Sequence, residues 1–138
     1  MTVLLDTNII MDVLQERQPF DIAAKEIMLL GQNGKIKCFF TANAATDIFF
    51  LYSKARGRKT AKYALAFLLG TYGVVTVTKE DCLKALDLQN DDFEDALVEI
   101  CAKNVNADYI ISRDDKFADI ATEVKVIKPD ELLALLKD

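Results

Sequence analysis

The sequence predicts an α/β domain of three layers, with a central parallel sheet of about four to five strands between two layers of helices. Short apolar runs alternate with helical patterns along the chain of 138 residues, and this alternation implies crossover connections and therefore parallel strands. The apolar runs are almost wholly hydrophobic, as strands covered on both faces must be. At this length we expect a single domain, residues 1–138.

Five apolar runs predict the strands. Each run is short, is rich in β-branched or aromatic residues, and is bounded by turn or helix signals. In chain order they are residues 3–5, 38–41, 74–77, 109–112 and 124–127.

Apolar residues spaced three and four positions apart predict helices between these runs. Pro19 suits the first turn of the second helix, Gly57 and Gly70 end the third and fourth helices, and Pro129 opens the last. In chain order the predicted helices are residues 8–15, 19 to about 31–34, 44–54, 60–69, 79–88, 92–104, 116–121 and 130–136. Because helices outweigh strands, we expect the pair within residues 44–69 to stand out beyond the sheet.

The composition excludes several kinds of active site. The chain has a net charge of −5 and no histidine, so it can form neither a Ser–His or Cys–His nucleophile pair nor a histidine metal site. The three cysteines fit no zinc spacing, and we expect them to be reduced thiols in a cytoplasmic protein. No apolar stretch reaches the roughly 18 residues of a membrane span, and the first residues lack a secretory signal pattern.

Five acidic residues are notable for their positions at strand ends or in helices. In chain order they are Asp6, Asp47, Asp92, Asp95 and Asp114. Asp92, Asp95 and Asp114 can each be explained as a helix cap or a first-turn acid, whereas Asp6 and Asp47 have apolar neighbours that leave them costly to bury. If the first and fourth strands are neighbours, the acids meet at the carboxyl edge of the sheet, where α/β proteins bind ligands.

Three or four carboxylates at one edge would repel one another and raise each other's pKa. A divalent cation removes this conflict, and a ligand set made only of oxygen atoms favours Mg²⁺ or Mn²⁺. Such an ion generates hydroxide from bound water, so a hydrolytic reaction would need no histidine base.

Three blocks of the sequence carry most of these acids. They are Leu-Leu-Asp-Thr-Asn at residues 4–8, Asp-Phe-Glu-Asp-Ala-Leu at residues 92–97 and Ala-Asp-Tyr-Ile-Ile-Ser-Arg-Asp at residues 107–114. Together, in this order and spacing, the blocks resemble the PIN domain, a family of small metal-dependent ribonucleases that includes many toxins of bacterial and archaeal toxin–antitoxin pairs. The resemblance spans essentially the whole chain.

The resemblance implies a catalytic site made of Asp6, Asp47, Asp95 and Asp114. It implies that Asp6, Asp95 and Asp114 are the metal ligands. Asp47 stands where the family usually has Glu, and the shorter side chain implies either ligation through water or a weakened site.

Neighbouring residues are expected to support these acids. The resemblance implies that Asn8 and Ser112 orient carboxylates or water by hydrogen bonds, and that Asp92 is either a further acid at the rim of the site or a helix cap. Asp12, one helical turn beyond Asn8, could also face the site, but we expect it to lie on a solvated face. We expect Arg113, next to Asp114, to pair with a carboxylate.

A local concentration of positive charge contrasts with the acidic chain. The basic residues are Lys54, Arg56, Arg58, Lys59 and Lys62. One interpretation is an electrostatic footprint for RNA phosphates, with Tyr52 and Tyr63 beside it able to stack on bases. The alternative is a solvated loop between two helices.

The helices within residues 44–69 carry more apolar side chains than a small sheet needs. Ordinary core is the default interpretation, and the alternative is a surface for a second copy of the chain or for an antitoxin. In toxin relatives a cationic antitoxin side chain can fill the acidic pocket, so the resemblance also implies that this pocket is a partner site. We therefore expect an RNA substrate, an antitoxin partner, a homodimer and no membrane association.

These observations predict a Mg²⁺- or Mn²⁺-dependent endoribonuclease that hydrolyses RNA phosphodiester bonds, as the toxin of a toxin–antitoxin pair. The alternative is a weak or inactive PIN-like module that binds RNA or a protein partner. A phosphatase using an Asp nucleophile fits less well, because the second Asp it needs is Asn8 here. A receiver-type domain would need an acid pair before its strand-end Asp and a late Lys that we cannot place.

Overall fold

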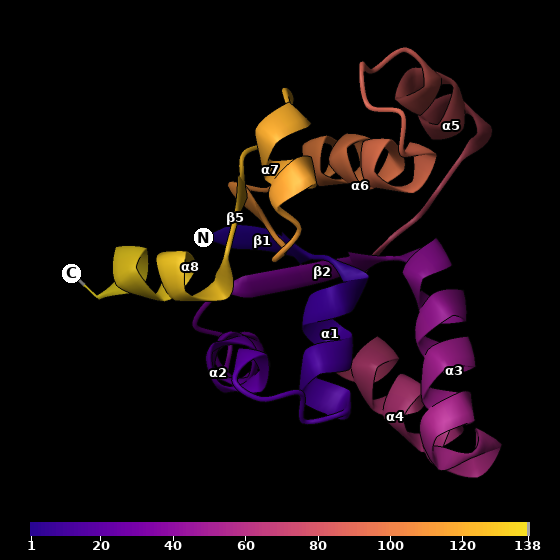
Figure 1. Ribbon diagram of the computed structural model, residues 1–138, viewed down its shortest axis with the longest axis vertical. Helices are drawn as coiled ribbons and strands as arrows, with labels where there is room; N and C mark the ends of the chain where they lie inside the picture. Colours follow the sequence, from indigo (N-terminus) through magenta and orange to yellow (C-terminus); the bar gives the residue numbers. More distant parts are fainter. Residues whose placement is uncertain (138) are drawn as a thin grey trace.

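The computed structural model describes residues 1–137 and contains a five-stranded parallel sheet flanked by helices on both faces (Figure 1). The predicted fold class is confirmed, and the predicted domain, residues 1–138, ends one residue beyond the described part. The strands are β1 (Thr2–Leu5), β2 (Lys37–Thr41), β3 (Gly73–Val75), β4 (Tyr109–Ile111) and β5 (Val126–Ile127). The helices are α1 (Thr7–Leu14), α2 (Phe20–Gln32), α3 (Ala42–Arg56), α4 (Arg58–Thr71), α5 (Lys79–Leu86), α6 (Phe93–Asn104), α7 (Asp115–Ile120) and α8 (Pro129–Leu136).

The strand order places the two predicted acidic strand ends side by side. The order is β3-β2-β1-β4-β5, and every neighbouring pair is parallel. Val3 of β1 lies opposite Cys38 of β2 and Tyr109 of β4. The ladder continues past β1, because the backbone N–H of Asp6 donates to the carbonyl of Ile111 over 2.9 Å. Asp6 and the loop after β4 therefore leave the sheet at the same edge.

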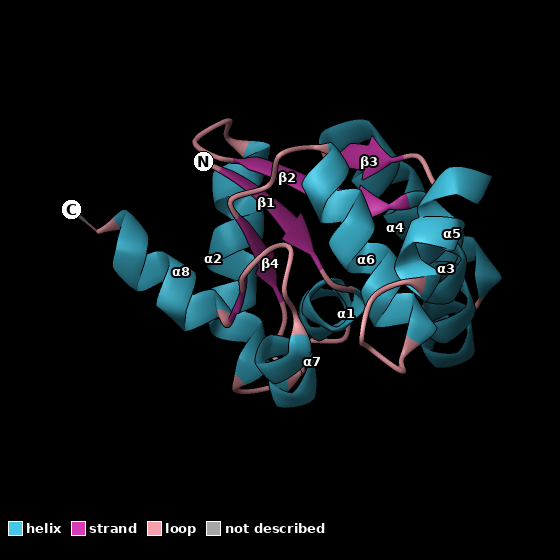
Figure 2. Cartoon of the chain, turned by 90° about the horizontal axis from the view of Figure 1, so that it is seen from above, coloured by secondary structure: helices cyan, strands magenta, loops and turns pink. Residues whose placement is uncertain are grey.

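The sheet separates two hydrophobic cores (Figure 2). On one face, Val3 and Leu5 of β1 pack with α1, α2, α3, α4 and α8. On the other face, Leu4 packs with α5, α6 and α7. Successive side chains of a strand point to opposite faces, so the apolar residues 3–5 of β1 supply both cores.

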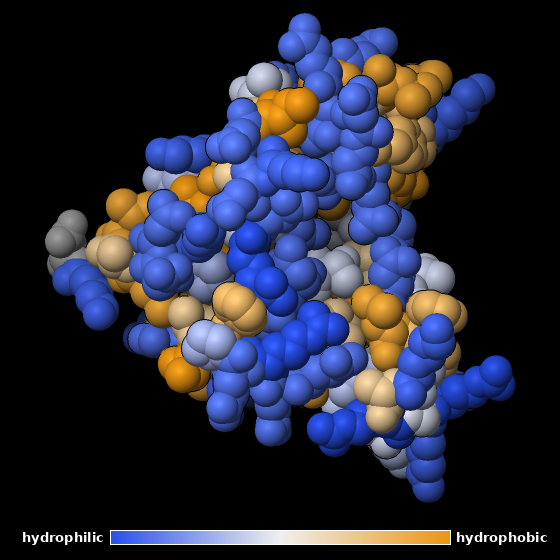
Figure 3. Space-filling view, viewed as in Figure 1, coloured by the Kyte–Doolittle hydropathy of each residue, from blue (hydrophilic) through white to orange (hydrophobic). Residues whose placement is uncertain are grey.

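Helices α3 and α4 form an arm that stands out beyond the sheet, as expected (Figure 1). Gly57 joins the two helices with a φ of 87° and a ψ of 159°, a region of the backbone map that is essentially open only to glycine. Thr41 caps α3 by accepting a hydrogen bond from the N–H of Ala44 over 3.2 Å. The outline of the molecule is hollowed between this arm and the part formed by α5 and α6 (Figure 3).

The edges of the sheet differ most from the prediction. The strands expected at residues 74–77 and 124–127 are shorter, covering Gly73–Val75 and Val126–Ile127. Both are edge strands with a single neighbour. β3 ends at Val75 because β2 ends opposite it at Thr41, whereas β5 ends at Ile127 as predicted and pairs with β4 only from Val126. Helix α4 also continues through Gly70 to Thr71, because a glycine weakens a helix without stopping it. Within residues 1–137, no helix has both the length and the apolar character that membrane crossing requires.

Candidate active site at the carboxyl edge of the sheet

Asp6 is the central acid of the candidate site. It follows β1 and caps α1 by accepting a hydrogen bond from the N–H of Thr7 over 2.8 Å. Its carboxylate also accepts hydrogen bonds from Ser112 Oγ (2.8 Å) and Asn8 Nδ2 (3.3 Å). The residue is 9% exposed, and this burial raises the pKa of Asp6, opposed by the bonds from Ser112 and Thr7 and reinforced by the charges of Asp114 and Asp92.

Asn8 and Ser112 form the hydrogen-bonding support that was predicted around Asp6. The buried Ser112 hydroxyl donates to Asp6 and accepts from the backbone N–H of Asp114 (3.1 Å) and from Asn8 Nδ2 (3.2 Å). Because a carboxylate can only accept, the amide nitrogen of Asn8 must be the atom that faces it. The amide oxygen of Asn8 is then buried without a partner among the described residues.

The start of α6 brings further acids to the same edge. Asp92 caps this helix and accepts a hydrogen bond from the backbone N–H of Asp95 over 3.1 Å. Burial, followed by the charges of Asp92, Asp6, Asp114 and Glu94, raises the pKa of Asp95 to about 7. The charges of Asp6 and Asp114 thus act on Asp95, although the three acids come from separate elements. Asp92 is therefore the helix cap, and its role as a further acid at the rim of the site stays a prediction.

Asp114 belongs to the loop between β4 and α7. Its carboxylate caps α7 by accepting hydrogen bonds from the N–H groups of Lys116 (3.0 Å) and Phe117 (3.4 Å). Its charge contributes to the raised pKa values of Asp6 and Asp95. The same Asp114 carboxylate therefore both caps α7 and acts by its charge on the other acids of the candidate site.

Asp47 lies on the arm, and its charge acts on Glu94, an acid that is not among the predicted site residues. Burial raises the pKa of Glu94, followed by the charges of Asp47, Asp6 and Asp92. Glu94 directly precedes Asp95 in the first turn of α6, and this adjacency is the signal that could have included it. We refer to Asp6, Asp47, Asp92, Glu94, Asp95 and Asp114 as the acidic cluster.

The expectation for Asp12 was wrong, and that for Arg113 is confirmed. Asp12 does not lie on a solvated face, because its side chain is 0% exposed. The Arg113 guanidinium clamps it with two hydrogen bonds, from Nε (2.6 Å) and Nη2 (2.8 Å), and Arg17 Nη1 lies 3.5 Å away. The ring of Phe20 covers the guanidinium at 4.1 Å. Arg113 thus ties the loop that carries Asp114 to α1.

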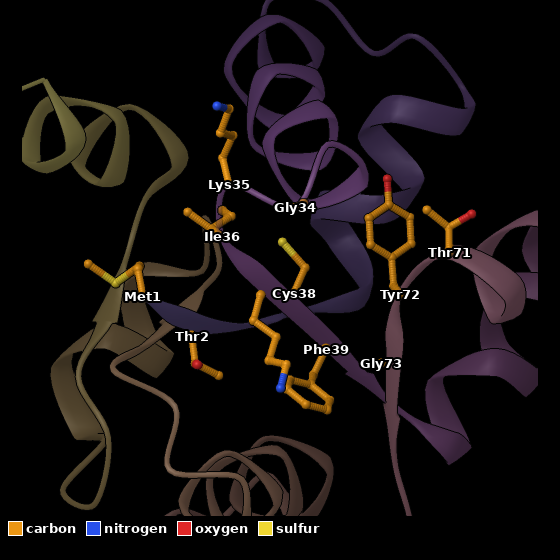
Figure 4. A pocket seen from close by; sticks show the side chains of 12 residues that line it. Met1, Thr2, Gly34, Lys35, Ile36, Cys38, Phe39, Thr71, Tyr72 and Gly73 are labelled. Carbon is orange, nitrogen blue, oxygen red and sulfur yellow. The ribbon is translucent and has the colours of Figure 1, made fainter.

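A cavity at the opposite end of the sheet has a different character. It measures about 550 Å³ and lies among the first residues of β1, β2 and β3, with Cys38, Phe39 and Tyr72 around it (Figure 4). Burial raises the pKa of the Cys38 thiol to about 12, so the sulfur stays protonated and unreactive. The Tyr72 hydroxyl is engaged with the carbonyl of Met28 over 2.9 Å. This end of the sheet offers no acidic cluster and no activated nucleophile among the described residues.

The match to known proteins agrees with the site's geometry. A family model described as the PIN domain matches residues 2–116. The chain belongs to the PIN domain family. The matched segment contains the whole acidic cluster, from Asp6 to Asp114. No curated protein sequence matches the chain.

Solved structures similar to this PIN domain include toxin–antitoxin proteins. VapBC2 from Rickettsia felis, bound to a DNA fragment from its promoter, has a TM-score of 0.69 and 14% identity, covering 93% of this chain and 98% of that one. Mycobacterium tuberculosis VapC20, a toxin that cleaves the sarcin–ricin loop, has a TM-score of 0.69 and 18% identity, covering 89% and 98%. A toxin–antitoxin complex from Klebsiella pneumoniae has a TM-score of 0.68 and 19% identity, covering 92% and 97%. At these identities the similarity shows the fold.

The donor set of the acidic cluster suits the divalent cation that the PIN family implies. Carboxylates supply the oxygen ligands that Mg²⁺ and Mn²⁺ prefer, and burial together with the charges of the neighbouring acids raises the pKa of Asp95. The unpartnered oxygen of Asn8 is a buried acceptor suited to a water molecule. In the conformation described for residues 1–137, no three acidic or cysteine side chains are arranged to hold an ion. The metal ligands predicted from the sequence therefore stay a prediction.

The predicted basic residues lie on the arm, at the end of α3 and the start of α4. Lys54, Arg56, Arg58, Lys59 and Lys62 are all exposed. No ion pair within residues 1–137 involves any of these five cations, so their charge is available to an anionic ligand. Tyr63 is exposed, but Tyr52 is buried, so the idea that Tyr52 stacks on a base was wrong.

Proposed function

We propose that this PIN domain is a Mg²⁺- or Mn²⁺-dependent endoribonuclease and the toxin of a toxin–antitoxin pair. The observation that carries the proposal is the convergence of the acidic cluster, whose members come from the end of β1, from α3, from α6 and from the loop after β4. Single caps such as Asp6, Asp92 and Asp114 each stabilise a helix, but gathering like charges at one edge opposes folding. A metal-dependent hydrolase needs them there.

Asp6, Asp95 and Asp114 would hold the ion, and Asp47, opposite Glu94, would act on it through water. When bound, the cation lowers the pKa of its water and polarises the phosphate, which is the chemistry of phosphodiester hydrolysis. The chain's own contribution is orientation. Ser112 and Asn8 fix the Asp6 carboxylate by hydrogen bonds, and such partners of ligands commonly tune metal affinity.

The five cations of the arm would bind RNA phosphates near the acidic cluster. The net charge of the chain is −5, so RNA would be repelled from most of the surface and attracted to the arm. Cleavage of the sarcin–ricin loop by the structurally similar VapC20 supports RNA as the substrate class.

An antitoxin and a second copy of the chain are the proposed protein partners. The similar structures from Rickettsia felis and Klebsiella pneumoniae are toxin–antitoxin proteins, and exposed apolar residues on the arm, such as Leu51 and Leu69, would suit either partner. The three free cysteines fit a protein that acts in the reducing cytoplasm.

An RNA cleavage assay with Mg²⁺, with Mn²⁺ and with EDTA tests the proposal. We expect cleavage by the wild type with either metal, none with EDTA, and a loss of at least a hundredfold in Asp6→Asn. Asp115→Asn is the matched control, because Asp115 is exposed and its carboxylate pairs with Lys128 outside the cluster. Cleavage in EDTA, or full activity in Asp6→Asn, would contradict the mechanism.

A binding module without catalysis is the second candidate. It is favoured by the lack of a preformed three-residue metal site within residues 1–137 and by the short side chain of Asp47. Calorimetry separates the two candidates. Heat of binding with Mn²⁺ or Mg²⁺ in the wild type that disappears in Asp6→Asn supports the enzyme, and no binding at millimolar metal supports the module.

A further inference from the structure

The arm carries a hollow of about 450 Å³ on the surface of α3 and the start of α4. Its lining combines aromatic, hydroxyl and basic side chains, namely Thr46, Phe49, Phe50, Ser53, Lys54 and Arg58. The acidic cluster does not use any of these residues, and the hollow is open to solvent beside the exposed Lys54 and Arg58.

Three features of the lining point to a planar ligand with negative charge. Phe50 is 58% exposed, and this exposure leaves its ring available for stacking. Lys54 places its ammonium 4.8 Å from the centre of that ring. The hydroxyl of Ser53 is buried without a hydrogen-bond partner among the described residues, and a buried polar atom of this kind favours a ligand that can pair with it.

The hollow lies beside the acidic cluster along α3. Asp47, Phe50 and Lys54 are spaced three and four positions apart and therefore share one face of the helix. With a rise of 1.5 Å per residue, Phe50 lies about 5 Å and Lys54 about 11 Å along the helix axis from Asp47. A strand whose phosphate reaches the acids would therefore place a neighbouring nucleotide over Phe50.

We propose that this hollow is a nucleobase subsite for single-stranded RNA. Phe50 stacks on a base, the Ser53 hydroxyl pairs with its edge, and Lys54 and Arg58 bind the adjacent phosphates. This deepens the proposed ribonuclease function and rests on it for the choice of RNA. The unpaired cations around the hollow favour an anionic chain over a neutral protein segment. The exposed Phe50 ring beside them favours RNA over an acidic protein segment, because nucleobases stack on aromatic rings.

Binding of a fluorescently labelled single-stranded RNA in EDTA, followed by anisotropy, tests the subsite without cleavage. Phe50→Leu should weaken binding about tenfold, within the range typical of losing one stacked base, whereas Phe50→Trp should retain it. An otherwise identical RNA with abasic positions should bind wild type and Phe50→Leu alike. Lys54→Ala should weaken both RNAs and reduce the salt dependence of binding.

Phe67→Leu is the matched control, because Phe67 lies on α4 of the same arm, is 50% exposed and does not line the hollow. It should bind RNA as the wild type does, and equal thermal midpoints would show that both Leu variants are folded. Unchanged binding in Phe50→Leu, or an equal loss in Phe50→Leu and Phe67→Leu, would overturn the subsite. Unchanged RNA binding in Phe50→Leu together with loss of binding to a protein partner would also overturn the subsite. Metal-dependent cleavage with no role for Phe50 would refute the subsite alone, and stacking at Phe50 without cleavage would refute the nuclease alone.

Discussion

Replacing Arg113 with Met should destabilise the protein strongly, although Arg113 is partly exposed and lies outside the acidic cluster. The substitution removes both hydrogen bonds that clamp Asp12, of 2.6 and 2.8 Å, while the carboxylate stays fully buried. Losing one partner of a buried ion pair costs about 3–5 kcal/mol. Arg17 remains 3.5 Å from Asp12, so we expect the lower end, about 3 kcal/mol. For a chain of this length, that corresponds to a fall of about 10 °C in Tm.

Urea unfolding followed by circular dichroism measures the free energy of unfolding directly. Lys103→Met is the matched control, since it breaks an exposed ion pair with Glu123 of similar length, 2.8 Å, and should leave the midpoint unchanged. The double variant Asp12→Leu/Arg113→Met removes both charges and should recover most of the loss. A loss below about 1 kcal/mol in Arg113→Met, or a double variant no more stable than the single one, would refute the assignment of Arg113 as the tie between α1 and the β4–α7 loop.

Three further predictions concern the cluster and the arm. Folding raises the pKa of Asp95 from 3.8 to about 7, so the metal-free protein should lose stability as pH rises from about 4 to 7. Asp95→Asn should flatten this dependence of Tm on pH. A wild-type Tm that stays constant over that range would contradict the prediction. Because the Asp95 proton must leave when a metal binds, the Mn²⁺ affinity measured by calorimetry should rise about tenfold per pH unit below pH 7 and then level off. Ser112→Ala should weaken Mn²⁺ binding about 10- to 100-fold. An affinity that does not change with pH would contradict the role of Asp95, and one that does not change in Ser112→Ala would contradict the role of Ser112. In urea unfolding, Gly57→Ala should lower the free energy of unfolding by about 1–3 kcal/mol, because the φ of 87° at this position is strained for alanine. Gly70→Ala, in open space within α4, should raise the free energy of unfolding by about 0.5–1 kcal/mol. Equal effects of the two substitutions would refute the strain at Gly57.

The parts of the site that could be predicted from sequence depend on local rules. A wholly apolar run followed by a polar residue marks the end of a buried strand, and parallel topology brings such ends to one edge. These rules place Asp6 and Asp114 together once β1 and β4 are neighbours, as the strand order shows. Cap preferences likewise identify Asp92 and Asp114 as helix starts, which the structure confirms.

The parts that could not be predicted depend on partners distant in the chain or on small rotations of a helix. Asp12 is buried because Arg113, 101 residues later, reaches it, and no pattern around residue 12 reveals that guanidinium. Glu94 and Asp95 are adjacent in one helical turn, and the sequence does not say how far each reaches toward Asp47 or Asp6. Those distances follow from the packing of α6 and from the position of the arm.

The loop between β4 and α7 shows how a cluster of like charges is tolerated in a small domain. Burial, and after it the charges of neighbouring acids, raises the pKa of Asp6 and Asp95, so keeping these acids ionised at one edge opposes folding. Three consecutive residues of this loop are each held by a different element: Ser112 by Asp6 at the end of β1, Arg113 by Asp12 of α1, and Asp114 by the first N–H groups of α7. The strongest of these attachments, the clamp on Asp12, lies just outside the repelling acids. The clamp on Asp12 can therefore hold the loop in place before a cation arrives, because, unlike the bonds made by Asp6 and Asp114, it does not depend on the charges that the cation would neutralise.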